Sequence, residues 1–167
     1  MSSTPRPESN EDTHRAVASV SLPEKQEHCV TVDAAAAGCL QQALNSALHE
    51  LDAAPLQEFV FGGCRHYPAY ERALESAESP TTWLQGDAGR SGEMLCLQAL
   101  SVSGFAITPI RLYGALAGHW YEDDHERFCH LGGILPRDVD ASREDQTRDV
   151  LEQMEEALAT CGMVFTD

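Results

Sequence analysis

The segment from 119 to 162 constrains the possible folds of this chain more than any other stretch. A strand-like run leads into two adjacent glycines, and a polar loop then separates it from a helix expected over 142–161. Ser142 is a good N-cap, because its hydroxyl can accept a backbone N–H of the first helical turn. Gly162 supplies the left-handed residue at which helices commonly end. The segment therefore predicts a strand, a loop and a helix.

The predicted helix is one-sided and needs a sheet to cover its apolar face. The apolar positions recur at steps of three and four residues; they are Val150, Leu151, Met154, Leu158 and Cys161. The acids on the remaining positions, expected to be solvated, are Glu144, Asp145, Asp149, Glu152 and Glu156. The chain ends at Asp167, where the next strand should begin. We interpret the chain as truncated within this unit.

Charge and composition exclude several classes of partner. The 167 residues include 27 acids against 11 bases, which gives a net charge of −16. Binding to nucleic acid needs clustered Lys and Arg, and anionic membranes repel an acidic protein, so we expect neither partner. No apolar run approaches the roughly 20 residues that cross a bilayer. Residues 1–13 lack the apolar core of a signal peptide and are expected to be a disordered tail.

Cysteine usage agrees with a protein that stays inside the cell. The six cysteines are Cys29, Cys39, Cys64, Cys96, Cys129 and Cys161. They occur singly, without a CxxC pair, and no secretion signal precedes them. We therefore expect reduced thiols and a cytoplasmic protein.

The first part of the chain, residues 14–104, reads as one α+β domain. The expected elements are strands over 16–22 and 28–32, a helix capped by Asp33 and closed by Pro55, a strand over 56–61, a helix over 68–77, and strands over 81–85 and 93–103. In the first helix Leu40, Leu44 and Leu48 share one face. The glycine-rich GDAGRSG sequence predicts a hairpin between the last two strands. Such an order favours a sheet with helices packed on one face.

Residues 105–167 begin the same pattern again, with strands followed by the 142–161 helix. Sequence identity between the two parts is negligible, so the repeat rests on the order of elements alone. We predict one complete, diverged domain over 14–104 and a partial one over 105–167.

The segment 129–167 resembles the Rid/YjgF superfamily, which includes enamine/imine deaminases and is also called endoribonuclease L-PSP. The residues that carry the resemblance are Leu131-Gly132-Gly133, Pro136, Gln146-Thr147 and Cys161-Gly162. In addition, Pro80-Thr81-Thr82-Trp83 and the strand after it are similar to the last two strands of family members. A two-domain chain of this kind resembles the long, chorismatase-like branch.

The resemblance implies a chorismate-mutase-like fold, assembled as a homo-oligomer (a trimer), with ligand clefts between domains. It implies a small carboxylated metabolite as ligand and no cofactor. Backbone groups near the family's glycine-type turn line its cleft, so Gly132 and Gly133 are ligand-cleft candidates.

The family's catalytic residues do not carry over to this chain. The arginine that binds the substrate carboxylate corresponds to Pro80, and the glutamate that helps to position water corresponds to Gln98. Neither side chain can take over these roles. In the second part both positions would lie beyond Asp167. The catalytic residues are therefore unknown, and we predict weak or no imine-deaminase hydrolysis.

Two other functions stay open. One is a non-catalytic subunit that associates with copies of itself or with another Rid-like chain through an exposed strand edge or apolar face. The other is a chorismatase-like hydrolase in an intact form of the protein.

Two further groups of residues invite chemical interpretations. The first contains the ligand-type side chains His119, Asp123, Asp124, His125, Cys129 and His130. Their spacing fits no standard zinc pattern, and strand alternation would send them to opposite faces, so we expect no metal. The second, residues 62–66, follows a strand and precedes a helix. Arg65 could bind an anion there, Cys64 could be a reactive thiol, or the segment could be a plain turn.

Overall fold

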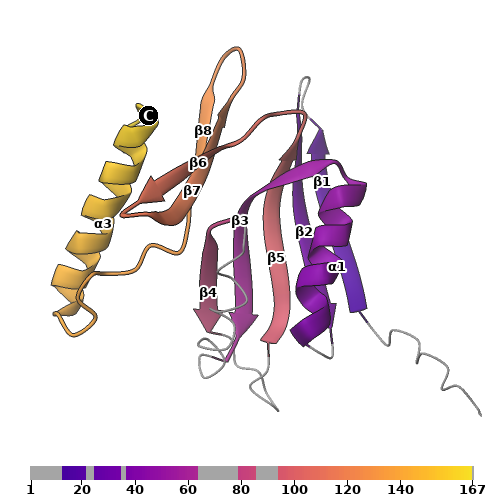
Figure 1. Ribbon diagram of the computed structural model, residues 1–167, viewed down its shortest axis with the longest axis horizontal. Helices are drawn as coiled ribbons and strands as arrows, with labels where there is room; N and C mark the ends of the chain where they lie inside the picture. The colour runs from indigo at the N-terminus through magenta and orange to yellow at the C-terminus, as the bar shows by residue number, and fades with distance from the viewer. Residues whose placement is uncertain (1–12, 22–24, 35–36, 64–78, 86–93, 167) are drawn as a thin grey trace, which may run out of the picture.

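The computed structural model describes residues 13–21, 25–34, 37–63, 79–85 and 94–166. The protein is α+β, with two β-sheets and two helices in these ranges (Figure 1). A five-stranded sheet carries helix α1 on one face, and helix α3 lies beside a three-stranded sheet. The expected helix over 68–77 falls outside the described residues. Neither described helix is long and apolar enough to cross a membrane.

The first sheet has the strand order β1-β2-β5-β3-β4. Its strands are β1 (Thr13–Ser21), β2 (Gln26–Ala34), β3 (Ala53–Gly62), β4 (Thr81–Gln85) and β5 (Met94–Ser103). β3 and β4 are parallel, and all other neighbours are antiparallel. The strands predicted from residue patterns are therefore confirmed, with longer bounds for the first three.

The predicted hairpin between 81–85 and 93–103 is wrong, because β3 lies between these two strands. β5 takes the centre of the sheet, where Leu97 and Ala99 are completely buried. These side chains are buried because β5 has a neighbouring strand on each side. A hairpin with the edge strand β4 would not place β5 at the centre of the sheet.

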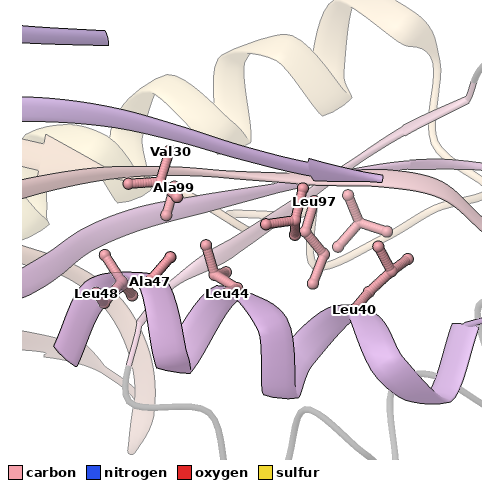
Figure 2. Close-up of a cluster of buried hydrophobic side chains, with 9 residues drawn as sticks. Val30, Leu40, Leu44, Ala47, Leu48, Leu97 and Ala99 are labelled. Carbon is pink, nitrogen blue, oxygen red and sulfur yellow. The ribbon is translucent and has the colours of Figure 1, made fainter. Parts of the chain in front are cut away.

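Helix α1 (Ala37–Glu50) packs its leucine face onto the sheet, as predicted. Figure 2 shows Leu40, Leu44 and Leu48 directed toward side chains of β2 and β5. Two details of this prediction are wrong. Asp33 lies inside β2, opposite Cys96, four residues before the helix begins at Ala37. Pro55 lies in β3 next to an irregularity in the pairing, a place where a missing N–H is tolerated.

Glu58 of β3 is a buried carboxyl group, only 3% exposed. The Ser79 hydroxyl donates a hydrogen bond of 2.6 Å to its Oε1, whereas its Oε2 has no partner in the described part of the chain. Burial raises the pKa of this carboxyl above its ordinary value of 4.5, and the hydrogen bond from Ser79 opposes the rise. Glu58 therefore keeps its proton more readily in the folded protein than in the unfolded chain.

We expect Glu58→Gln to stabilise the protein increasingly as the pH rises from 4.5 toward neutrality. The unfolded chain loses the Glu58 proton near pH 4.5, while the folded state retains it up to its raised pKa. Over that window the wild type loses stability that the glutamine variant, which does not ionise, keeps. Urea unfolding between pH 4 and pH 8 measures the difference. Glu155→Gln, at an exposed position of α3, should stay within about 0.5 kcal/mol of wild type. A pH-independent difference for Glu58→Gln would contradict the prediction.

The second sheet is antiparallel and consists of β6 (Thr108–Leu112), β7 (Ala115–Glu122) and β8 (Arg127–Leu131). Helix α3 (Arg143–Thr160) packs against it through Ala157, and Cys161 at its end joins the same apolar cluster. The strands of the protein thus divide between two sheets at residues 104–107.

The predicted ends of helix α3 are confirmed. The Ser142 hydroxyl oxygen accepts the Asp145 N–H at 3.2 Å, and Gly162 has a left-handed φ of +73°. The predicted apolar face is partly wrong, since Leu151 is 48% exposed while Gln153 is buried. Gln153 tolerates burial because its amide donates to the Leu135 carbonyl at 3.0 Å.

A mixed apolar and charged contact joins the two sheets. Leu56 and Val102 of the first sheet pack against Tyr121 of β7. Beside them, the Lys25 ammonium lies 3.2 Å from the centre of the Phe128 ring and pairs with Glu27 at 3.3 Å. The Tyr121 hydroxyl donates to the same Glu27 carboxylate at 3.0 Å. These contacts connect the beginning of β2 to the hairpin β7–β8.

Candidate functional site

The turn that follows β8 lies directly against the edge strand β4 of the other sheet. The Gly132 N–H donates to Ala117 O at 2.9 Å, and the Gly133 N–H donates to the Thr82 hydroxyl oxygen at 3.1 Å. Gly133 has a left-handed φ of +68°, and a Cβ placed on it would lie 2.6 Å from Thr81 O. The approach of the two backbones therefore requires glycine at this position.

A cleft of about 240 Å³ opens between this turn and β4. Residues Thr81–Trp83 of β4 form one wall, the segment 131–135 forms another, and Val150 and Met154 of α3 close the third side. Its volume lies below the roughly 300–1,000 Å³ of typical small-molecule sites. The cleft suits a small metabolite and is too small for a macromolecule.

The walls of the cleft are mostly apolar, with one well-placed hydroxyl. Thr82 Oγ1 accepts hydrogen bonds from the Gly133 N–H and from the Gln57 amide at 3.3 Å. With its acceptor capacity used in this way, the Thr82 hydroxyl keeps its own proton to donate. None of the described residues that line the cleft is acidic, basic or a histidine. The arrangement can bind and orient a ligand, but these walls offer no group for acid–base chemistry.

The structure brings only some of the predicted site residues together. Gly132 and Gly133 line the cleft, whereas Arg65 and Cys64 lie outside the described residues. Gln98 lies on β5, where its amide donates to the Thr31 hydroxyl at 3.1 Å. The contributions of Thr82 and Gln57 were missed from the sequence, because no local pattern connects them with a turn that lies 51 residues beyond Thr82 and still further from Gln57.

The cluster of ligand-type side chains around β7 and β8 is dispersed in the structure. His119 is buried, and its Nδ1 lies 3.1 Å from Leu56 O; burial lowers its pKa. His130, its cross-strand neighbour, also has a pKa lowered by burial. Asp123 instead accepts the backbone N–H of His125 and of the next residue in the hairpin turn.

Strand alternation separates Cys129 from these histidines. Cys129 packs toward α3, in the cluster that contains Cys161, while the neighbouring Phe128 faces the first sheet. In the described ranges, no group of three His, Cys, Asp or Glu side chains is placed to hold a metal ion.

Comparison of the chain with models of protein families, with curated proteins and with solved structures finds no match.

Proposed function

We propose that this chain is a Rid/YjgF-like protein that binds a small molecule in the cleft between β4 and the turn 132–133. The observation that carries the proposal is the close approach of Gly133 to Thr81 and Thr82, which places a glycine turn and an edge strand around one small cleft. This turn is also one of the segments on which the family resemblance rests.

The architecture supports the fold part of this proposal. A chorismate-mutase-like domain needs a sheet with helical cover on one face, and the first sheet carries α1 in this way. In the second part of the chain, a β7–β8 hairpin is followed by a helix, as β1–β2 is followed by α1. We infer from this correspondence that residues 14–104 and 105–167 are a diverged pair of domains.

The walls of the cleft define the ligand further. An apolar body would contact Trp83, Val150 and Met154, while an acceptor atom would meet the Thr82 hydroxyl proton. A carboxylate on the ligand needs a cation, and the described walls supply none. The carboxylated metabolite therefore stays a prediction that depends on Arg65.

The same walls support weak or absent hydrolysis. Imine hydrolysis needs a group that moves a proton and a group that activates water. By the resemblance, Pro80 and Gln98 correspond to the family's arginine and glutamate, and neither side chain titrates. We propose binding as the function of this chain, with hydrolysis of 2-iminopropionate far below that of an active deaminase.

Pyruvate, the keto acid released from 2-iminopropionate, is the probe for the site. In a ¹H–¹⁵N NMR titration we expect the Gly132, Gly133 and Trp83 signals to shift together, because these residues line the cleft. Thr82→Val keeps the side-chain shape but removes the hydroxyl, so the affinity should fall about 5- to 20-fold. Thr108→Val makes the same change at an exposed position of β6 and should leave binding unchanged.

Two outcomes would overturn parts of this proposal. Shifts confined to residues away from the turn, or no shifts at millimolar pyruvate, would remove the cleft as a site for a keto acid. Full-rate hydrolysis of 2-iminopropionate by the purified chain would refute the absence of catalysis while leaving the site in place.

A second candidate function is a non-catalytic subunit that assembles as a homo-oligomer. Val20 of β1 and Leu84 of β4 are 59% and 39% exposed, and both lie on the sheet face opposite α1. Exposed apolar side chains on a sheet face favour association. The family resemblance makes a trimer, or a complex with another Rid-like chain, the expected assembly. Sedimentation as a monomer at micromolar concentration would contradict this candidate.

A further inference from the structure

Two cysteines from distant parts of the second unit meet in its apolar core. Cys129 lies on the face of β8 that packs toward α3, and Cys161 is the residue that caps α3 at its C-terminal end. Cys129 packs against the buried cluster that contains Cys161, and the Cys161 thiol donates to Leu158 O at 3.1 Å. Both belong to the cluster that holds α3 on the sheet.

A separate contact fixes the end of α3 at this part of β8. Arg127 precedes Cys129 by two residues and therefore lies on the same face of the strand. Its guanidinium donates a hydrogen bond to the carbonyl oxygen of Cys161. It also forms an ion pair with Glu122, with an N–O distance of 2.6 Å. This hydrogen bond holds the Cys161 backbone beside β8. The two cysteines are therefore kept close by Arg127 as well as by their own packing.

The two sulfur atoms differ in their access to solvent. Cys161 is only 4% exposed, whereas Cys129 is half-buried, so a dissolved reagent reaches Cys129 first. Cys29 and Cys96 on the first sheet offer a contrast. Cys29 pairs with Leu100, four residues along β5 from Cys96. That offset is about 13 Å, beyond the roughly 7 Å that a disulfide spans between Cα atoms.

We propose that Cys129 and Cys161 are a redox-active dithiol that closes into an intramolecular disulfide joining β8 to the end of α3. The oxidant is a small dialkyl disulfide of the glutathione type. The Cys129 thiolate attacks one sulfur of this reagent and releases the first thiol. The Cys161 sulfur then attacks the Cys129 sulfur of the mixed disulfide and releases the second.

The exchange is balanced in atoms and electrons. One S–S bond is broken in the reagent and one is formed in the protein. The two electrons of the protein dithiol reduce the reagent, and the two thiol protons end on the released thiols.

The environment makes this exchange slow at neutral pH. Burial and the adjacent Cys161 raise the pKa of the Cys129 thiol to about 12. Only the thiolate attacks, so the rate of closure should rise about tenfold for each pH unit between 7 and 10. The dithiol is therefore oxidised slowly at neutral pH, and the disulfide forms only when oxidising conditions last.

The test uses the folded full-length chain with oxidised glutathione and no denaturant. In one variant Cys129 and Cys161 are the only thiols, because the other four are replaced: Cys29→Ser, Cys39→Ser, Cys64→Ser and Cys96→Ser. After an acid quench, peptide mapping should show a cross-link between the peptides that contain the two residues. Closure should raise the Tm by roughly 5–10 °C, and dithiothreitol should reverse the rise.

Two matched controls keep the result specific. A variant that retains only Cys29 and Cys96 should form no cross-link, and Cys129→Ser in the wild-type background should show no rise in Tm. If the fourfold replacement prevents folding, mapping of the wild-type protein under the same quench decides the question. Three results would overturn the proposal: a stable glutathione adduct on Cys129 without closure, a cross-link between chains, or closure only after unfolding in urea.

Discussion

Gly133→Ala should lower the free energy of unfolding by about 3–4 kcal/mol and abolish binding in the cleft. A methyl group on Gly133 would lie 2.6 Å from Thr81 O, which belongs to the backbone of β4 and cannot rotate away. The left-handed φ of +68° adds the strain of an L-residue in that conformation. Urea unfolding followed by Trp fluorescence measures the loss of stability, and the pyruvate titration measures the loss of binding.

Gly114→Ala is the matched control for this prediction. Gly114 also has a left-handed φ, +88°, but a Cβ placed on it meets nothing within 4 Å. This variant therefore reports the backbone strain alone, about 1–2 kcal/mol. Equal losses of stability in the two variants would mean that β4 moves away from the turn without cost. The close approach of Gly133 to β4 would then give no support to the cleft as a ligand site.

Leu44→Ala should cost about 3–4 kcal/mol. Leu44 is completely buried, and it lies between Leu40 and Leu48 on the face of α1 that Figure 2 shows against the first sheet. Truncation removes apolar contacts and leaves a cavity that a helix held by leucines on both sides cannot fill by moving. The change should appear as a lower urea midpoint with an unchanged m-value.

Asn45→Ala tests whether the effect belongs to the buried face. Asn45 is the next residue of the same helix and is exposed, with a hydrogen bond to Gln41 on the surface. Its replacement should change stability by about 0.5 kcal/mol or less. A loss below about 1 kcal/mol for Leu44→Ala would show that α1 does not hold the first sheet together.

Local patterns were enough to find most of the described elements. The run Thr81–Gln85 was predicted with the bounds that β4 has, because its β-favouring residues end at a glycine. Helix α3 was found through Ser142 and Gly162, whose capping roles depend only on neighbours within four residues. Signals that depend only on near neighbours can be read from a single sequence.

Such local signals could not predict how the strands pair. GDAGRSG favours a hairpin, yet β5 leaves β4 to pair with β2 and β3. The choice depends on where Leu97 and Ala99 are best buried, which only the assembled sheet determines. The Asp33 cap failed for the same reason, since pairing with β5 extends β2 through this residue.

The candidate site, too, could be predicted from the sequence only in part. Gly132 and Gly133 were candidates because the segment around them resembles the glycine-type turn of the Rid/YjgF family. The opposite wall could not be predicted, since Thr82 belongs to another sheet and its hydroxyl becomes informative only when the Gly133 N–H is seen to bind it. The contact of Cys129 with Cys161 was hidden likewise by the loop and helix between them.

The central position of β5 has a consequence for how the chain acquires its structure during synthesis. Strands β1 to β4 leave the ribosome before the strand that joins β2 to β3, so the first sheet must wait for residues 94–103. The second sheet pairs strands that are adjacent in the chain and forms from local contacts as it emerges. Until β5 is inserted, the early strands carry unpaired edges, and that interval is when the nascent chain is most open to aggregation.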